Sequence, residues 1–292
     1  MVYADDFLAE EALKFVAQNK ERPFFLYWSM VVPHANNERT RALKDGAEVP
    51  DYGPYGDRDW PNPDKGQAAM ITRLDSYVGR MLAEVKRLGL DRKTLVIFTS
   101  DNGPHNESNH NLARFQPSRP FSGVKRSLTD GGIRVPVIAW WPGTVKAGTV
   151  SGHVAYFGDW FATSCELAGA TVPAGLDSIS FVPALRGRSG KQKRHEFLYW
   201  EFHERGFSQA ALYQGRWKGI RERSLDAPIQ LYDLHADPGE QRNLAAKAPA
   251  TAAKLDAYLK TSRSVSRDWP VAVPPGEEAA GESRPGQKPR SR

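Results

Sequence analysis

The hydrophobic positions of this chain alternate between helical and strand-like spacing. Three segments place their apolar residues on one helical face: Asp5–Asn19, Gln67–Leu88 and Tyr156–Ala168. Three short, nearly continuous apolar runs stand between and around them: "FFLYWSMVV" (24–32), "TLVIFTS" (94–100) and "VPVIAWWP" (135–142). Such runs are typical of strands that are buried on both faces. The alternation therefore predicts an α/β fold with a mostly parallel sheet flanked by helices.

The pattern changes in the C-terminal third of the chain. The runs "FLYWEF", "ALYQGRWKGI" and "IQLYDL" predict strands, with a hairpin turn at Gln214-Gly215, and Ala248–Lys260 predicts a last helix. We therefore expect an α/β domain over residues 1–190 and a small antiparallel sheet with one helix over 191–265. Residues 266–292 are expected to be a disordered tail, because the end of the chain is rich in Pro, Gly, Glu, Arg and Ser.

Composition narrows the class of protein only slightly. The 292 residues are 40% hydrophobic, which is ordinary for a globular protein, and no apolar run is long enough to span a membrane. The first residues are acidic where an export signal needs basic ones, so we expect no signal peptide. The net charge of +6 indicates no particular partner, and we expect no nucleic-acid partner. The single cysteine, Cys165, excludes an internal disulfide and is expected in the core.

Polar side chains follow the first two predicted strands. His34 comes directly after the first, and Asp101, Asn102 and His105 come after the second. In open α/β sheets ligands bind beyond the carboxyl ends of the strands. Asp and Asn oxygens there suit a hard cation such as Ca²⁺ or Mg²⁺. The same residues could instead form a simple Asx-type turn.

A third candidate is Lys125, in a glycine-containing loop shortly before the third predicted strand. A lysine in that position could hold an anion as a point charge. The alternative is an ordinary solvated loop lysine. Neither spacing nor composition decides between the two.

The order of the motifs is more specific than any of them alone. "FFLYWSMVVPH", then S-D-N-G (100–103), G-x-K (123–125) and G-G-I-R-V-P (131–136), resembles bacterial arylsulfatase-type sulfatases of the alkaline-phosphatase-like superfamily. The resemblance extends to about Lys260. It implies an alkaline-phosphatase-like fold that is incomplete at its N-terminal side. It also implies hydrolysis of the sulfate ester of a small molecule or a polysaccharide. Such enzymes are usually periplasmic or secreted, and the compartment of this chain stays open.

The resemblance also implies roles for individual residues. Asp101 and Asn102 would bind a divalent cation, usually Ca²⁺. Lys125 and His34 would contact the sulfate and the leaving oxygen. The remaining two histidines of the region, His105 and His110, would lie at the substrate mouth. The chemistry agrees, because attack at sulfur needs fixed cations against its oxygens, and the leaving oxygen needs a proton or a cation.

One departure from the family is large. The nucleophile of sulfatases is a formylglycine made from the Cys or Ser of a C/S-x-P-x-R motif, and this sequence has no such motif. "FQPSR" (115–119) has the spacing but places Phe115 where the nucleophile belongs. Two aspartates that complete the family's metal site are also absent. The sequence therefore resembles the C-terminal portion of a sulfatase, and we expect it to be catalytically incomplete.

Two alternatives remain open. The chain could be a non-catalytic remnant or an interaction module, or a phosphodiesterase or phosphatase of the same superfamily. The G-G-I-R-V-P and D-P-G-E segments favour the sulfatase interpretation over the phosphatase one.

Overall fold

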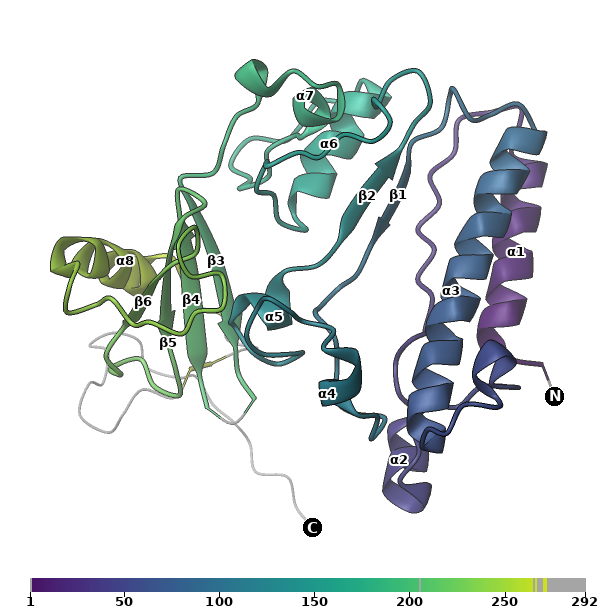
Figure 1. The fold of residues 1–292 in the computed structure, drawn as a ribbon. Coiled ribbons are helices and arrows are strands. Elements are labelled where there is room, and N and C mark those ends of the chain that lie inside the picture. Colours follow the sequence, from purple (N-terminus) through teal and green to yellow (C-terminus); the bar gives the residue numbers. More distant parts are fainter. Residues whose placement is uncertain (1, 205, 265, 267–269, 272–292) are drawn as a thin grey trace, which may run out of the picture.

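The computed structural model describes residues 2–204, 206–264, 266 and 270–271. Figure 1 shows two long helices on one side, a two-stranded ribbon in the middle, and a four-stranded sheet with one helix on the other side. The polar site described below lies between these parts. Most of the predicted tail, 266–292, lies outside the described residues.

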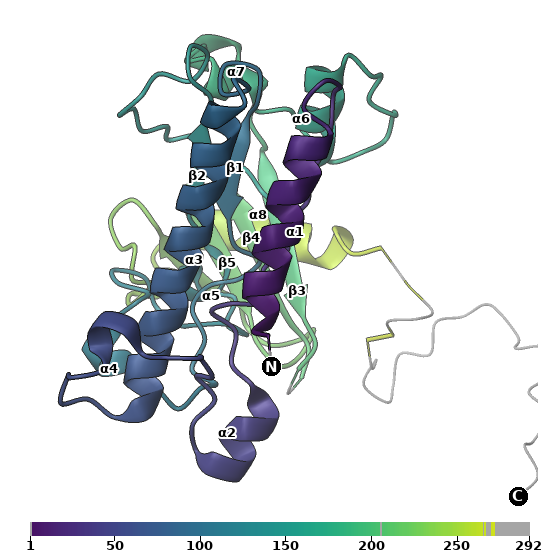
Figure 2. The same cartoon turned by 90° about the vertical axis from the view of Figure 1, so that its right-hand side faces the viewer.

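The two long helices form the first core. Helix α1 (Ala4–Gln18) packs along α3 (Asn62–Arg87), and Figure 2 shows them side by side. Ala9, Met70 and Tyr77 are buried between them, as apolar residues at helical spacing require. Both predicted helices are confirmed. The second begins five residues earlier than Gln67, in a first turn that contains Pro63, where the missing N–H costs nothing.

The central sheet differs from the prediction. Strands β1 (Val96–Thr99) and β2 (Val137–Trp140) pair with each other in antiparallel register, Val96 opposite Trp140. No parallel pair occurs among the described strands, so the predicted parallel sheet is wrong for this part of the chain. Burial on both faces is also wrong, because Val137 and Ile138 are each 60% exposed.

The first apolar run, residues 24–32, is extended but is not a strand of either described sheet. Leu26 and Trp28 pack against the core between α1 and α3, while Phe25 and Tyr27 point away from it and are exposed. The alternation of apolar side chains therefore gives this segment one packed face. A strand also needs a hydrogen-bonding neighbour, which the sequence pattern does not supply.

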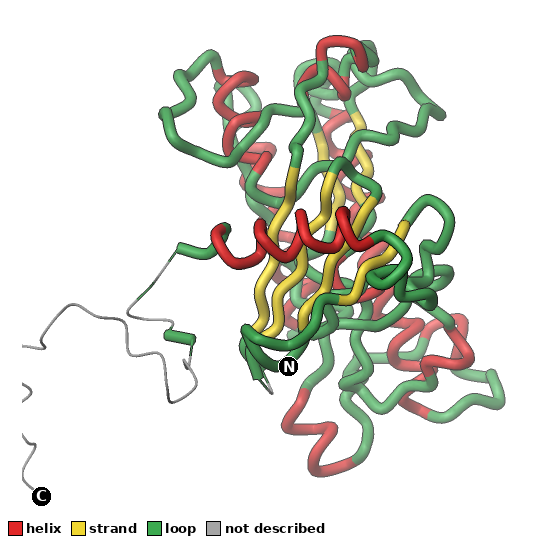
Figure 3. The backbone as a smooth tube through the Cα atoms, turned by 90° about the vertical axis from the view of Figure 1, so that its left-hand side faces the viewer, coloured by secondary structure: helices red, strands yellow, loops and turns green. Residues whose placement is uncertain are grey.

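The C-terminal prediction is confirmed in its elements. Strands β3 (Phe197–Phe202), β4 (Ser208–Tyr213), β5 (Trp217–Arg221) and β6 (Gln230–Asp233) form an antiparallel sheet in chain order. Helix α8 (Pro249–Thr261) lies across one face and buries Leu255 and Leu259 (Figure 3). Gln214 and Gly215 both have positive φ, as a tight hairpin turn requires. The domain boundary at residue 190 stays a prediction.

Short helices connect these parts. The ones that carry or flank the site are α2 (Asn37–Leu43), α4 (Leu112–Phe115) and α5 (Asp130–Ile133). Helix α6 (Asp159–Ala168) confirms the predicted amphipathic helix, begins three residues late, and carries Cys165 in a half-buried position. The others are α7 (Val182–Leu185) and the 3₁₀ turns Gly53–Tyr55 and Ser189–Lys191.

The exposed strand surface predicts self-association. Among the described strands, neither β1 nor β2 has a second neighbour, and flat apolar edges recruit other chains. We expect size-exclusion chromatography with light scattering to give a mass well above that of one chain. Val137→Lys should lower that mass, because a charge on an edge strand opposes pairing.

The matched control is Val150→Lys, at a 98% exposed loop position outside both sheets. It adds the same charge and should leave the mass unchanged. A monodisperse monomer that melts cooperatively would contradict the prediction.

Candidate functional site

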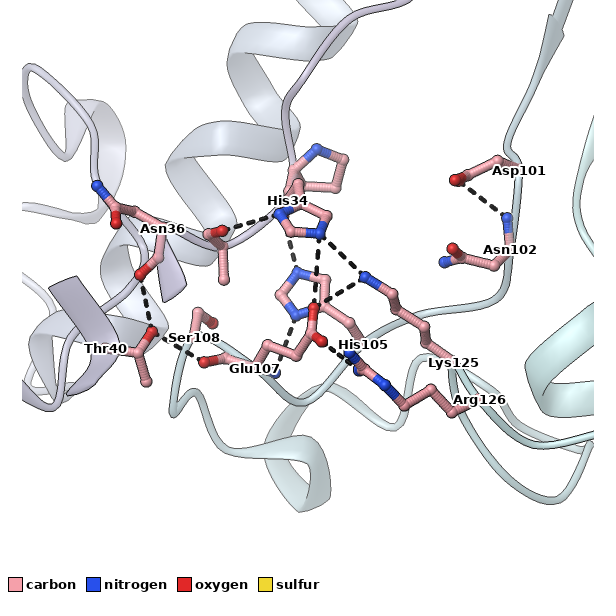
Figure 4. A network of polar contacts seen from close by, with 12 residues as sticks. His34, Asn36, Thr40, Asp101, Asn102, His105, Glu107, Ser108, Lys125 and Arg126 are labelled. Atoms are coloured by element: carbon pink, nitrogen blue, oxygen red, sulfur yellow. Dashed lines mark hydrogen bonds and ion pairs between the residues drawn. The ribbon is translucent and has the colours of Figure 1, made fainter. Parts of the chain in front are cut away.

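Three segments that are distant in sequence meet at the candidate site (Figure 4). They are the end of the extended segment at His34, the turn after β1, and the loop that leads into α5. Lys125 Nζ lies 2.9 Å from His34 Nε2, although 91 positions separate the two residues. The structure therefore brings together the two residues expected to contact the sulfate.

Close backbone packing places Lys125. The Lys125 N–H donates to the Pro104 carbonyl (2.8 Å), and the Gly103 N–H donates to the Gly132 carbonyl (2.8 Å). A Cβ on Gly103 would lie 2.0 Å from the Gly131 carbonyl oxygen, so only glycine allows this approach. The S-D-N-G and G-G-I-R motifs are thus two halves of one backbone contact.

With Lys125 as an ammonium, the two hydrogen bonds of His34 assign its tautomer. A lysine ammonium has no acceptor, so His34 Nε2 accepts from Lys125, and Nδ1 carries the proton that bonds to the Ala35 carbonyl (2.8 Å). His34 is therefore a neutral imidazole in this arrangement. Of the two residues, Lys125 therefore carries the positive charge and the N–H groups that can donate.

Sequence analysis missed Glu107, which organises this cluster. Its carboxylate accepts hydrogen bonds from Lys125 Nζ (2.9 Å) and from Arg126, and it lies 3.6 Å from His34 Nε2. Burial alone would raise the pKa of Glu107, but the bonds from Arg126 and Lys125 lower it to about 2. A glutamate in a polar loop gives no sequence signal, because its partners come from other segments.

His105 and His110 lie beneath the cluster. His105 is buried, its Nε2 donates to the Pro33 carbonyl (2.8 Å), and its Nδ1 accepts from the Glu107 N–H (3.0 Å). His110 is also buried, with Nδ1 2.5 Å from Ser108 Oγ. Burial lowers the pKa of both imidazoles. These contacts make them supports of the loop, and their place at a substrate mouth stays a prediction that this geometry does not favour.

Asp101 and Asn102 lie to one side of the cluster, beyond Lys125 (Figure 4). Asp101 is exposed, and its Oδ1 accepts from the N–H of the next residue, Asn102 (2.9 Å), one residue short of the contact that defines an Asx turn. The Asn102 amide nitrogen donates to the Gly103 carbonyl (2.8 Å), so the amide oxygen is the atom that a cation could use.

The oxygen atoms of Asp101 and Asn102 are suitable ligands for Ca²⁺ but would supply only part of its coordination shell. Ca²⁺ takes six to eight oxygen ligands. Within the described part of the chain, no group of three or more His, Cys, Asp or Glu side chains is placed to hold a metal ion. A cation at Asp101 and Asn102 would need further ligands.

A buried ion cluster holds the loop of Lys125 against the C-terminal sheet. Lys218 on β5 is 1% exposed, and its Nζ lies 2.7 Å from Asp130 Oδ1 and 2.9 Å from Glu240 Oε1. The Asp130 N–H also donates to Glu240 Oε2 (2.6 Å). Burial raises the pKa of Glu240, so the carboxylate depends on Lys218 to stay charged. The start of α5 is thereby tied to the sheet.

Comparison with known proteins identifies the family. The sulfatase family profile matches residues 1–170, and a profile described as "N-sulphoglucosamine sulphohydrolase, C-terminal" matches residues 123–264. The chain belongs to the sulfatase family. Membership supports sulfuric ester hydrolysis as the activity of the family.

Curated relatives agree with this assignment. Canine (Canis lupus familiaris) N-acetylgalactosamine-6-sulfatase is 29% identical over 91% of the chain and 52% of its own length. Mouse (Mus musculus) steryl-sulfatase is 31% identical over 88% of the chain and 44% of its own length. Human (Homo sapiens) arylsulfatase A is 29% identical over 97% and 55%. This sulfatase chain spans about half the length of these relatives.

Solved structures support the fold. The structure of Ps i-CgsB in complex with k-i-k-neocarrahexaose matches with a TM-score of 0.73 and 25% identity, covering 89% of the chain and 55% of that protein. BT4656 in complex with D-Glucosamine-2-N, 6-O-disulfate matches at 0.64 and 17% identity, over 89% and 69%, which supports the fold alone. In the part of this sulfatase that the structure describes, no helix has the length and apolar character needed to cross a membrane.

The buried ion cluster predicts a large loss of stability in Lys218→Met. Methionine fills the space but leaves buried Glu240 without its cation and Asp130 with only the more distant Arg134. Breaking a buried pair in this way costs about 3–5 kcal/mol. The free energy of unfolding, measured by urea denaturation, should fall by about that amount.

Lys14→Met is the matched control, because Lys14 pairs with Glu11 at the exposed surface. It removes the same charge and should leave the denaturation midpoint nearly unchanged. An unchanged midpoint in Lys218→Met would contradict the structural role of the cluster.

Proposed function

We propose that this sulfatase chain carries the sulfate-recognition part of a sulfuric ester hydrolase. The observation that supports it best is the contact between Lys125 Nζ and His34 Nε2. It joins a fixed cation to a neutral imidazole at the point where the family motifs converge. The substrate would be a sulfate ester whose oxygens face Lys125.

The charge arrangement suits that substrate. A sulfate ester is a tetrahedral anion, and attack at sulfur builds charge on its oxygens and on the leaving oxygen. An ammonium held in place offsets that charge without reorganising during the reaction. Because His34 Nε2 accepts a hydrogen bond, Lys125 is the member of the pair that would donate a proton to the leaving oxygen.

The metal belongs to the proposal as well. Asp101 and Asn102 would supply two oxygen ligands to Ca²⁺ or Mg²⁺, and further ligands must complete the shell. When bound, the cation would polarise the sulfate. The formylglycine nucleophile of the family has no precursor motif in this sequence.

Sulfated carbohydrates are the substrate class that we favour. The similar structure of Ps i-CgsB holds a neocarrahexaose, and one of the relatives is an N-acetylgalactosamine-6-sulfatase. A sulfated small molecule such as an aryl sulfate remains the second candidate, because arylsulfatase A is among the relatives.

The recognition step can be tested by binding alone. Phenyl sulfate is a small probe, and ligand-observed NMR detects binding in the millimolar range. We expect binding to the wild type, loss of binding in Lys125→Ala, and unchanged binding in Lys14→Ala, which removes an exposed lysine outside the site. Equal binding by the wild type and Lys125→Ala would contradict the proposal, and a preference for phenyl phosphate would favour the phosphatase alternative.

The same measurement tests the metal. Ca²⁺ should strengthen phenyl sulfate binding relative to EDTA only if Asp101 takes part. Asp101→Ala should therefore abolish any Ca²⁺ effect, whereas His105→Ala should not, because both His105 nitrogens bond within the protein.

We expect this chain to show no catalytic turnover of a sulfate ester. Without the nucleophile, the reaction cannot be split into two easier covalent steps. The purified chain with Ca²⁺ should hydrolyse an activated aryl sulfate no faster than buffer does. Ca²⁺-dependent turnover that disappears in Lys125→Ala would show that the chain is a complete enzyme.

A further inference from the structure

Glu107 is the point on which the basic groups of the site converge. One carboxylate accepts from Lys125 and from Arg126, and its Oε2 lies within 4 Å of His34 Nε2. We propose that Glu107 is a positioning residue that holds the Lys125 ammonium against His34 with one N–H directed toward the substrate. This inference rests on the proposed sulfate recognition by Lys125.

The carboxylate is itself fixed from behind. The Glu107 N–H donates to His105 Nδ1 (3.0 Å), and its carbonyl accepts from Thr40 Oγ1 (2.9 Å). The next residue, Ser108, is fully buried and bonds to Gln67 on α3 (3.2 Å). Glu107 therefore projects from a segment anchored to α2 and α3, and its side chain is only 11% exposed. Such an anchored acceptor can set the position of a flexible lysine.

The direction of the contact leaves the substrate side open. Figure 4 shows Glu107 on the opposite side of the Lys125 ammonium from Asp101 and Asn102. An ammonium has three N–H donors. Contacts to His34 and Glu107 use two of them, on one side. The third remains for an oxyanion between Lys125 and the proposed cation site.

The backbone is arranged so that consecutive side chains reach the same carboxylate. Arg126 has φ +77°, a left-handed conformation that a residue with a side chain seldom adopts. Arg126 is held there by Glu107 and by Glu204, which precedes β4. Without the Glu107 carboxylate, the adjacent cations of Lys125 and Arg126 would repel each other. Glu107 thus offsets the charge that would otherwise drive Lys125 away from His34.

Chemical labelling of lysines tests the proposal without any catalysis. Trace acetylation with acetic anhydride, read by mass spectrometry, gives a rate for each lysine. An amine held in a hydrogen-bonded ion pair reacts slowly. In Glu107→Gln we expect Lys125 to react about tenfold faster than in the wild type, as loss of a charge-assisted contact implies.

Glu204→Gln is the matched control. It removes a carboxylate from the same Arg126 and changes the net charge equally, but it leaves Lys125 bound to Glu107. Lys125 labelling should stay within about twofold of the wild type, since the direct contact is intact. Equal acceleration in both variants would overturn the proposal, because net charge would then explain the effect. Unchanged Lys125 labelling in Glu107→Gln would overturn it too.

Buried Lys218 reports on folding in the same spectrum. Faster labelling at Lys218 would mean that the C-terminal sheet has opened, and Glu107→Asp then decides. That variant keeps the charge but shortens the side chain by one methylene, so Lys125 should still react faster. Lys125 labelling in Glu107→Asp equal to that in the wild type would overturn the proposal.

Failure of the proposed sulfate recognition would be seen in a different experiment, as phenyl sulfate binding that survives Lys125→Ala.

Discussion

The buried Lys218 ammonium is the interaction on which the site geometry depends. It is shared by Asp130 and Glu240 in a place that excludes water, where an unpaired charge is costly. The half-exposed Arg134 lies 3.3 Å from the other oxygen of Asp130 and adds a second cation beside the two carboxylates. The start of α5 therefore cannot move without separating charges in a medium that does not solvate them. The glycines of α5, and the loop that packs against them, are held in place by the same ion cluster.

A chain of polar contacts leads from Lys218 to the site. Asp130 fixes the glycine pair beside it, and the glycine pair packs against the turn after β1. That contact places Lys125, which meets Glu107 and His34. The hydrophobic clusters lie on either side, one between α1 and α3 and another beneath α8. Charge-assisted hydrogen bonds of Lys218 and Lys125 therefore connect the two hydrophobic cores at the candidate site.

Local patterns predicted the long helices and most of the strands, but not the pairing of the central strands. The apolar spacing of α3 and the Gln214-Gly215 turn depend on residues close in sequence, so periodicity and turn chemistry were sufficient. The apolar run over 24–32 has the right composition for a strand, yet its state depends on a neighbour that composition does not specify. The same limit applies to the site. Family motifs singled out Lys125 and His34 as sulfate contacts, whereas Glu107 is recognised only in the structure, where three segments come together.

The two halves of the proposed site differ in how firmly the chain holds them. Lys125 is fixed by backbone contacts, by Glu107 and by His34, so its charge is oriented before any ligand arrives. Asp101 is exposed and bonds to the N–H of its own neighbour. An electrostatic site lowers a barrier to the extent that its charges need not reorganise. The oxyanion side is therefore preorganised by this chain's own residues. The proposed cation side would gain its order only with a bound ion and further oxygen ligands beside Asp101 and Asn102.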